Sequence, residues 1–274
     1  MPLELGRFGV WRRVAEITPV MAAELERMGY GAVWIGGSPR GHLEEVEHIL
    51  AATERIPVVT GIVNMWREDA VTVGHSYLRI TERYPDRFVL GVGIGHPEST
   101  SEFTNPLNKI VEYLDQLDEV GVPRERTVLA ALGPRVLRLA AERTAGAHPY
   151  LTTPRHTELA RGVLGEGPLL APEQKVVLEK DADRARSAGR PVVSRYLRLS
   201  NYRNNLIREG WAAEDLVDDG SDRLIDALVL HGESDEVAEG LRAHVAAGAD
   251  HVGIQAVGED SVGQYRALAS VLFD

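Results

Sequence analysis

Short apolar runs alternate with amphipathic segments along the whole chain. The runs are apolar at consecutive positions, which is typical of strands buried on both faces of a parallel sheet. The strands predicted in this way cover residues 7–11, 32–37, 57–63, 87–95, 127–132, 147–153, 174–179 and 251–257. The alternation therefore predicts a parallel β-sheet that is covered by helices.

The segments between these strands carry apolar residues at helical spacing. Met21, Leu25 and Met28, for example, lie on one face of a predicted helix that ends at Gly29. Alternation of this kind fits an eight-stranded barrel or a doubly wound open sheet, and the length and repeat number favour the barrel. We therefore predict an α/β fold, a (β/α)8 TIM barrel, with residues 1–274 forming one domain.

A long, mostly helical stretch from Asp181 to about Leu230 follows the seventh predicted strand. The loops that follow the strands of a barrel form its catalytic face. We therefore expect this stretch, together with the loop 166–172, to form insertions that crown the C-terminal mouth.

Composition limits the chemistry that the chain can perform. The 274 residues include no cysteine, which excludes disulfides, thiolate nucleophiles and iron–sulfur clusters. The formal net charge is −11, and an acidic surface disfavours nucleic acid and anionic membranes as partners. No apolar run has the roughly 18 residues of a membrane span, and the first residues do not resemble a signal peptide. We expect a cytoplasmic protein.

Several reaction classes lack their essential residues. A Schiff-base enzyme needs a lysine near the C-terminal end of a strand, whereas Lys109 and Lys180 are predicted on helices and Lys175 at the start of its strand. The nine histidines are scattered without metal-binding spacing, so no metal site is expected. The predicted strand ends are small and apolar, which suits a bound cofactor that performs the chemistry.

Glycines gather at the predicted C-terminal ends of three strands. They are Gly36 and Gly37, then Gly61, and then the alternate positions 91, 93 and 95. Glycine weakens a strand because it has no side chain to pack. We interpret these positions as places where a flat ligand lies against bare backbone.

At these glycines the sequence resembles a known family. The stretch "YPDRFVLGVGIG" closely resembles the signature of the bacterial luciferase-like superfamily, and "TGIVN" followed by "ERYPDRFVLGVGIG" resembles its deazaflavin branch. The stretches "ALGPRVLRLAAERTAGAHPYLTTPRHT" and "NYRNNLIREG" are similar to motifs of an actinobacterial group in that branch. Members of that group are regarded as probable oxidoreductases that use coenzyme F420. The resemblance implies a luciferase-like barrel that binds the deazaflavin at its mouth.

The resemblance also implies roles for individual residues. The Gly61–Ile62 peptide bond is expected to be cis in a bulge that supports one face of the ring, with Asn64 within reach of the ring or the ribityl hydroxyls. Gly93, Gly95 and His96 match positions beside the ring. The tail phosphate is expected at Thr152, Thr153 and Pro154, because a capping Thr followed by Pro begins a helix there.

One departure from the superfamily's sequence pattern argues against one class of substrate. Its sugar-phosphate dehydrogenases carry Asp-His and Glu where this chain has Gly37-Ser38 and His96, so a sugar phosphate is not expected. His96 is the candidate catalytic residue, which would polarise the ring or the substrate; the alternative is a capping or packing role. His148 and His156 are interpreted as structural or surface residues.

Substrate contacts are predicted at four positions. Trp11 and Trp66, at the ends of the first and third strands, are expected to line the pocket or to belong to the ordinary core. Tyr202 and Arg203 either point into the mouth or begin a solvated helix. Gln255 is expected near the same mouth.

Three functions remain open on sequence alone. The leading one is an F420-dependent oxidoreductase that transfers a hydride to or from a small organic substrate. The second is an FMN-dependent monooxygenase of the same fold, and the third is a non-catalytic cofactor-binding barrel. A homodimer is the expected assembly.

Overall fold

The computed structural model describes residues 3–95 and 105–273. Its strands are β1 (Phe8–Arg13), β2 (Val33–Gly36), β3 (Val58–Gly61), β4 (Val63–Asn64), β5 (Phe88–Gly93), β6 (Thr127–Leu129), β7 (Gly146–Ala147), β8 (Leu169–Leu170), β9 (Glu173–Val177), β10 (Val229–His231) and β11 (Val252–Ala256). Its α-helices are α1 (Pro19–Arg27), α2 (Glu44–Ala51), α3 (Ala70–Arg83), α4 (Pro106–Val120), α5 (Pro134–Arg143), α6 (Pro154–Leu164), α7 (Ala182–Leu197), α8 (Ser200–Glu209), α9 (Asp222–Leu228), α10 (Ser234–Ala246) and α11 (Ser261–Leu272).

The strands form one parallel sheet that closes on itself. Their order is β10-β9-β11-β1-β2-β3-β5-β6-β7-β8, with β4 also paired to β5. The sheet closes because β8, at one end of this path, continues into β9, next to the other end; Ala171 and Pro172 alone separate them in the chain. The Ala171 amide donates to the Ala147 carbonyl, and the Gly253 amide donates to the Pro172 carbonyl, so both ladders continue through the break. The predicted (β/α)8 barrel of the luciferase-like type is confirmed.

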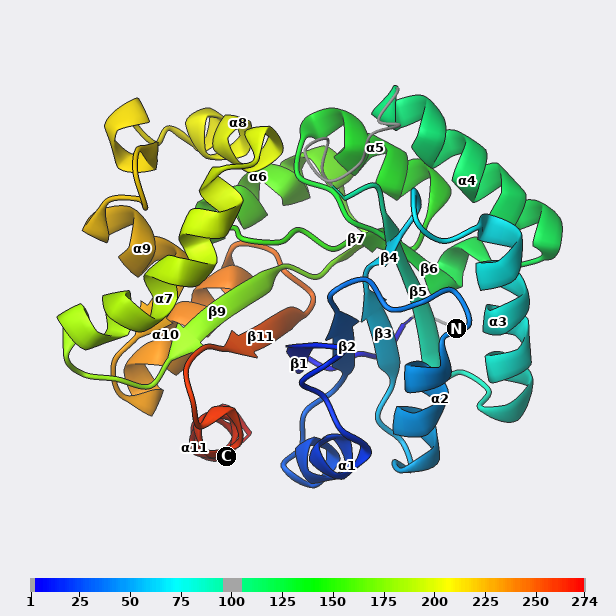
Figure 1. Cartoon of the computed structure of the whole chain (residues 1–274), viewed down its shortest axis with the longest axis horizontal. Helices are drawn as coiled ribbons and strands as arrows, with labels where there is room; N and C mark the ends of the chain where they lie inside the picture. The colour runs from blue at the N-terminus through cyan, green and yellow to red at the C-terminus, as the bar shows by residue number, and fades with distance from the viewer. Residues whose placement is uncertain (1–2, 96–104, 274) are drawn as a thin grey trace.

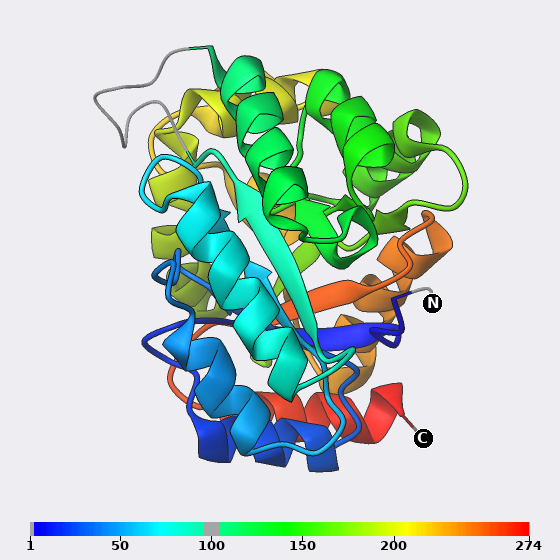
Figure 2. The ribbon, with the colours of Figure 1, turned by 90° about the vertical axis from the view of Figure 1, so that its right-hand side faces the viewer.

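Helices surround the barrel, as Figures 1 and 2 show. The apolar strands divide their side chains between two cores, because successive residues point to opposite faces. Val10, Val33 and Val58 face the helices in the main core. Trp11, Trp34 and Val59, one position further along, pack with each other inside the barrel.

The stretch between β9 and α10 forms a separate layer. It holds α7, α8 and α9, which gather on one side of the barrel in Figure 1 and enclose an apolar cluster of their own. The expected helical insertion is therefore present, but it ends in the strand β10, which the sequence analysis assigned to helix. The sixth strand, predicted over 147–153, is only Gly146–Ala147.

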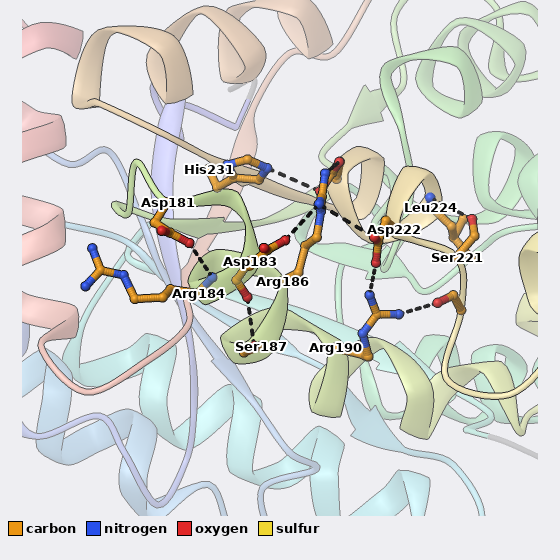
Figure 3. A network of polar contacts seen from close by, with 12 residues as sticks. Asp181, Asp183, Arg184, Arg186, Ser187, Arg190, Ser221, Asp222, Leu224 and His231 are labelled. Atoms are coloured by element: carbon orange, nitrogen blue, oxygen red, sulfur yellow. Dashed lines mark hydrogen bonds and ion pairs between the residues drawn. The ribbon is translucent and has the colours of Figure 1, made fainter.

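A polar network ties α7 to α9 and β10 (Figure 3). Arg186 of α7 makes a bidentate pair with Asp226 of α9, at 2.8 Å from Nε and 2.7 Å from Nη2. The His231 Nε2 atom lies 3.2 Å from the same carboxylate, and Arg190 pairs with Asp222. The network therefore fixes the insertion to the strand that follows it.

No helix among the described residues has the length and apolar character needed to cross a membrane.

Candidate functional site

A cavity of about 780 Å³ lies at the C-terminal ends of the strands. This volume is within the usual range of small-molecule and cofactor sites. Its walls come from β1, β3, β4 and β11, the loops after β2, β4, β5, β6 and β7, the first turns of α4 and α5, and residues of α7 and α8. The insertion thus closes one side of the barrel mouth.

Aromatic side chains form one wall of the cavity. Trp11 packs against Tyr150 with ring centroids 5.2 Å apart, and Tyr150 packs against Tyr196 at 5.1 Å. Two strand-end glycines make room for the indole ring. A Cβ on Gly36 would stand 1.9 Å from Trp11 Cζ2, and one on Gly61 would stand 2.7 Å from Trp11 Nε1. These glycines therefore admit a side chain of the protein itself.

Hydroxyl groups and a buried ion pair lie beneath the aromatic wall. The Tyr196 hydroxyl donates to the Tyr150 hydroxyl at 3.2 Å, which donates to Gln255 Oε1 at 2.9 Å. Below them the Lys175 ammonium lies 3.9 Å from the Tyr150 ring centroid and pairs with Glu173 at 2.9 Å. Both charged side chains are fully buried. Lys175 is the middle residue of β9, so its predicted place at the start of the strand is wrong.

Arginines surround the mouth of the cavity. Arg13, Arg67, Arg135 and Arg195 line it from four separate elements and are exposed. Among the described residues none of the four has a carboxylate partner. Arg12 also lines the cavity, but it pairs with Glu16 at 3.0 Å and donates to the Ala256 carbonyl. A chain with a net charge of −11 therefore presents, at this opening, positive charge that has no carboxylate partner among the described residues.

The structure brings many of the predicted site residues to this cavity. Its lining includes Trp11, Gly37, Gly61, Ile62, Asn64, Gly95, Tyr202 and Gln255. The Gly61–Ile62 bond is cis, which confirms that expectation. His96 lies outside the described residues, so its catalytic role stays a prediction.

Other predicted residues do not line the cavity. Gly36 lies behind the Trp11 ring, and a Cβ on Gly93 would meet Ala130 and Ile62. Trp66 lies beside the Lys109 ammonium, which is 5.4 Å from its ring centroid. Arg203 turns away, and its Nη1 atom donates to the Leu216 carbonyl at 2.8 Å.

The predicted phosphate residues lie beneath α8, away from the cavity lining. Thr153 caps α6 by accepting from the His156 amide, and its hydroxyl donates to Glu209 Oε2 at 2.8 Å. Asn205 donates to the other oxygen of Glu209 at 2.7 Å. Burial raises the pKa of Glu209 to about 7. The start of α6, with Thr152, Thr153 and Pro154, thus already has a carboxyl group beside it, and phosphate binding there stays a prediction.

Sequence reasoning missed several residues that line the cavity. His148 was assigned a structural or surface role, yet it lies in the wall directly after β7. Tyr150 and Tyr196 were not singled out, and neither were the four arginines at the mouth. His148 and Tyr150 follow a predicted strand end, the same signal that drew attention to the glycines. Arg195 and Tyr196 lie on the helical insertion and not after a predicted strand, so the sequence gave no indication that they reach the cavity.

The comparisons with known proteins agree with this architecture. No curated protein matches the chain at a significant level. Among solved structures, an F420-dependent secondary alcohol dehydrogenase in complex with an F420-acetone adduct is 14% identical with a TM-score of 0.77, over 99% of this chain and 98% of that one. The coenzyme F420 dependent tetrahydromethanopterin reductase from Methanopyrus kandleri is 16% identical with a TM-score of 0.73, over 98% of each chain.

A third solved structure binds a different cofactor. It is the oxygenating constituent of 3,6-diketocamphane monooxygenase from Pseudomonas putida, a type II Baeyer-Villiger monooxygenase in complex with FMN. It is 14% identical with a TM-score of 0.71, over 97% of this chain and 96% of that one.

At these low sequence identities, the similarity to the three solved structures establishes the fold alone. The family model described as luciferase-like monooxygenase matches residues 12–251. The chain therefore belongs to the luciferase-like monooxygenase family.

Proposed function

We propose that this protein is an oxidoreductase that uses coenzyme F420 to transfer a hydride to or from a small organic substrate. The observation that carries the proposal is the cavity at the barrel mouth, which combines an aromatic wall with rim arginines that have no carboxylate partner among the described residues. Solved structures with this fold include two enzymes described as F420-dependent.

The residues present suit a planar anionic cofactor. Trp11, Tyr150 and Ile62 would provide apolar surface for a tricyclic ring. Arg135 and Arg195 provide positive charge for a phosphate-bearing tail, because guanidinium groups bind phosphate strongly. When bound, the deazaflavin supplies a ring carbon that accepts or donates a hydride. The protein would hold the ring, exclude water and orient the substrate.

FMN is the competing cofactor, because it also carries a phosphate and a solved structure of this fold binds it. A monooxygenase must protect an oxygen adduct from water. A deazaflavin reacts poorly with oxygen and transfers a hydride instead, so its enzyme needs no such protection. The described lining offers one imidazole and one carboxylate, and Arg12 already pairs with that carboxylate. Hydride transfer therefore requires fewer catalytic groups from the cavity than oxygenation does.

Parallel titration with F420 and FMN tests the proposal. We expect micromolar binding of F420, weaker binding of FMN, and anaerobic turnover of the deazaflavin with alcohols, ketones or enones, followed by absorbance. Oxygen uptake is measured in a second cell with reduced FMN. Tight FMN binding with oxygen-dependent product formation, and no turnover with F420, would establish the monooxygenase instead.

A further inference from the structure

Two ring nitrogens in the cavity wall have no hydrogen-bond partner in the part of the chain that the structure describes. Trp11 and His148 are 4% and 2% exposed, and both line the cavity. Among the described residues, neither Trp11 Nε1 nor His148 Nε2 has a partner. Buried polar atoms in native proteins are nearly always bonded, so an unpaired pair at a cavity wall requires an explanation.

The two nitrogens flank the same glycine. A Cβ on Gly61 would stand 2.7 Å from Trp11 Nε1 and 3.4 Å from His148 Nε2. Gly61 is the last residue of β3 and lines the cavity as well. The two nitrogens thus approach one small region of the wall, where the backbone carries no side chain.

The nitrogens are complementary in hydrogen bonding. The His148 Nδ1 atom lies 2.6 Å from the Ala171 carbonyl oxygen, which can only accept, so Nδ1 carries the hydrogen. Burial lowers the pKa of His148 to about 4, which keeps the ring neutral at pH 7. His148 Nε2 is therefore an acceptor, whereas Trp11 Nε1 is always a donor.

The barrel contains a matched pair in which the same groups are satisfied. Trp34 Nε1 donates to His251 Nε2 at 2.9 Å, and His251 Nδ1 lies 2.8 Å from the Gly6 carbonyl oxygen. Trp34 also stacks on His148, with ring centroids 4.2 Å apart. Tryptophan and histidine can therefore pair directly in this interior. Trp11 and His148 do not, and they lie at the cavity.

We propose that Trp11 Nε1 and His148 Nε2 form a subsite for a hydroxyl group of the substrate, beside Gly61. A hydroxyl oxygen accepts from the indole and donates to the imidazole, so one atom satisfies both nitrogens. A ketone oxygen can only accept, which leaves His148 Nε2 unpaired, and leaving a buried acceptor unpaired weakens binding. This inference rests on the proposed function, and it identifies alcohols as the substrate class of the enzyme.

Matched alcohols and ketones test the subsite without any turnover. The probes are cyclohexanol with cyclohexanone and 2-propanol with acetone, titrated into the protein alone and into the protein with F420. The chain has four tryptophans, and the indole N–H signals in 15N NMR report on each of them. We expect the Trp11 signal to shift with the alcohols, at least tenfold tighter binding of each alcohol than of its ketone, and no shift of the Trp34 signal.

Two variants and one control separate the subsite from packing. Trp11→Phe removes the donor, and His148→Asn keeps a donor near Ala171 but removes the Nε2 acceptor. Both should bring the alcohol-to-ketone ratio close to one. Trp11→Phe should lower Tm only by the packing that the smaller ring loses, because the indole nitrogen that it removes is unpaired. Trp34→Phe should lower Tm because it leaves His251 Nε2 without its donor, and it should preserve the ratio.

The outcomes distinguish this inference from the proposed function. Equal affinities for alcohol and ketone, or a Trp11 signal that no alcohol moves, would overturn the subsite even if F420 binds and turns over. Failure of F420 binding together with a selective alcohol response would leave the subsite in place and overturn the cofactor assignment.

Discussion

Glu209 is the described residue whose protonation we expect to change stability near neutral pH. This residue is 4% exposed, and its carboxyl group accepts hydrogen bonds from Thr153 and Asn205. Its pKa of about 7 is above the ordinary value of 4.5 because of burial. The folded protein therefore binds this proton more tightly than the unfolded chain does. The contribution is fully present below pH 4.5 and is lost as pH rises through 7.

We predict that Glu209→Gln removes this pH dependence. Relative to the variant, the wild type should lose on the order of 3 kcal/mol of unfolding free energy between pH 5 and pH 8. Urea denaturation at several pH values measures it, and the difference between the two proteins cancels the contributions of the buried histidines. Glu158→Gln, at an exposed position on α6, is the control. Parallel curves for wild type and Glu209→Gln would contradict the prediction.

Residue-level interpretation identified the strand-end glycines but not all of their neighbours. Gly61 and Gly95 line the cavity as expected, whereas a Cβ on Gly91 would stand 1.8 Å from the Thr60 carbonyl oxygen. A glycine in the sequence shows that a position has no side chain, but the sequence does not show which neighbouring atoms occupy the space beside it. The neighbour of Gly91 comes from another strand, and the neighbour of Gly36 is Trp11.

At the scale of elements, long periodic segments were predictable and short ones were not. The strands β1, β2, β3 and β5 carry continuous apolar runs, and they lie where the pattern placed them. β10 has three residues and directly follows the apolar end of α9, so its sequence resembles a continuing helix. It is a strand because it pairs with β9, a contact between residues more than 50 positions apart.

The insertion gives a prediction at this scale. Asp226 accepts two hydrogen bonds from the Arg186 guanidinium, which lowers the pKa of that carboxyl. We predict that Asp226→Asn lowers the free energy of unfolding by about 1 kcal/mol, as for a partly exposed pair. Amide hydrogen exchange should become faster in α7 and α9, with β1 to β3 unchanged.

The control for this prediction is Asp183→Asn. Asp183 also contacts Arg186, at 3.2 Å, but its side chain is 92% exposed. Its loss should leave exchange in α7 and α9 unchanged. If both variants accelerate exchange equally, the bidentate pair is not what holds the insertion.

At the scale of the whole molecule, closure of the sheet positions the site. Every described lining residue of the strands lies toward a C-terminal end because all the strand pairs are parallel. The sequence predicted this common mouth from the eight strand–helix units. It did not predict which side chains of α7 and α8 would reach the mouth, because a helix carries side chains on all sides and only packing selects one.

The charge distribution of the molecule leads to a prediction about salt. The net charge of −11 repels anions at long range, whereas Arg13, Arg67, Arg135 and Arg195 attract them at the mouth. Salt screens exposed charges such as these arginines. We predict that raising NaCl from about 50 mM to about 500 mM weakens binding of phosphate-bearing F420 or FMN about tenfold. Riboflavin and the phosphate-free deazaflavin core should change less than about twofold.

The double variant Arg135→Gln/Arg195→Gln locates this effect at the cavity. It should weaken binding of the phosphate-bearing cofactor by about tenfold, or about 1.4 kcal/mol, and reduce its salt dependence, because two charge-assisted contacts are lost. Arg138→Gln is the matched control, since Arg138 lies on α5 but is exposed outside the cavity lining. If the double variant binds as the wild type does, or if the phosphate-free ring shows the same salt dependence, the tail lies away from these arginines. The start of α6 would then be the candidate phosphate site, and Thr153→Ala would be the next variant to titrate with the cofactor.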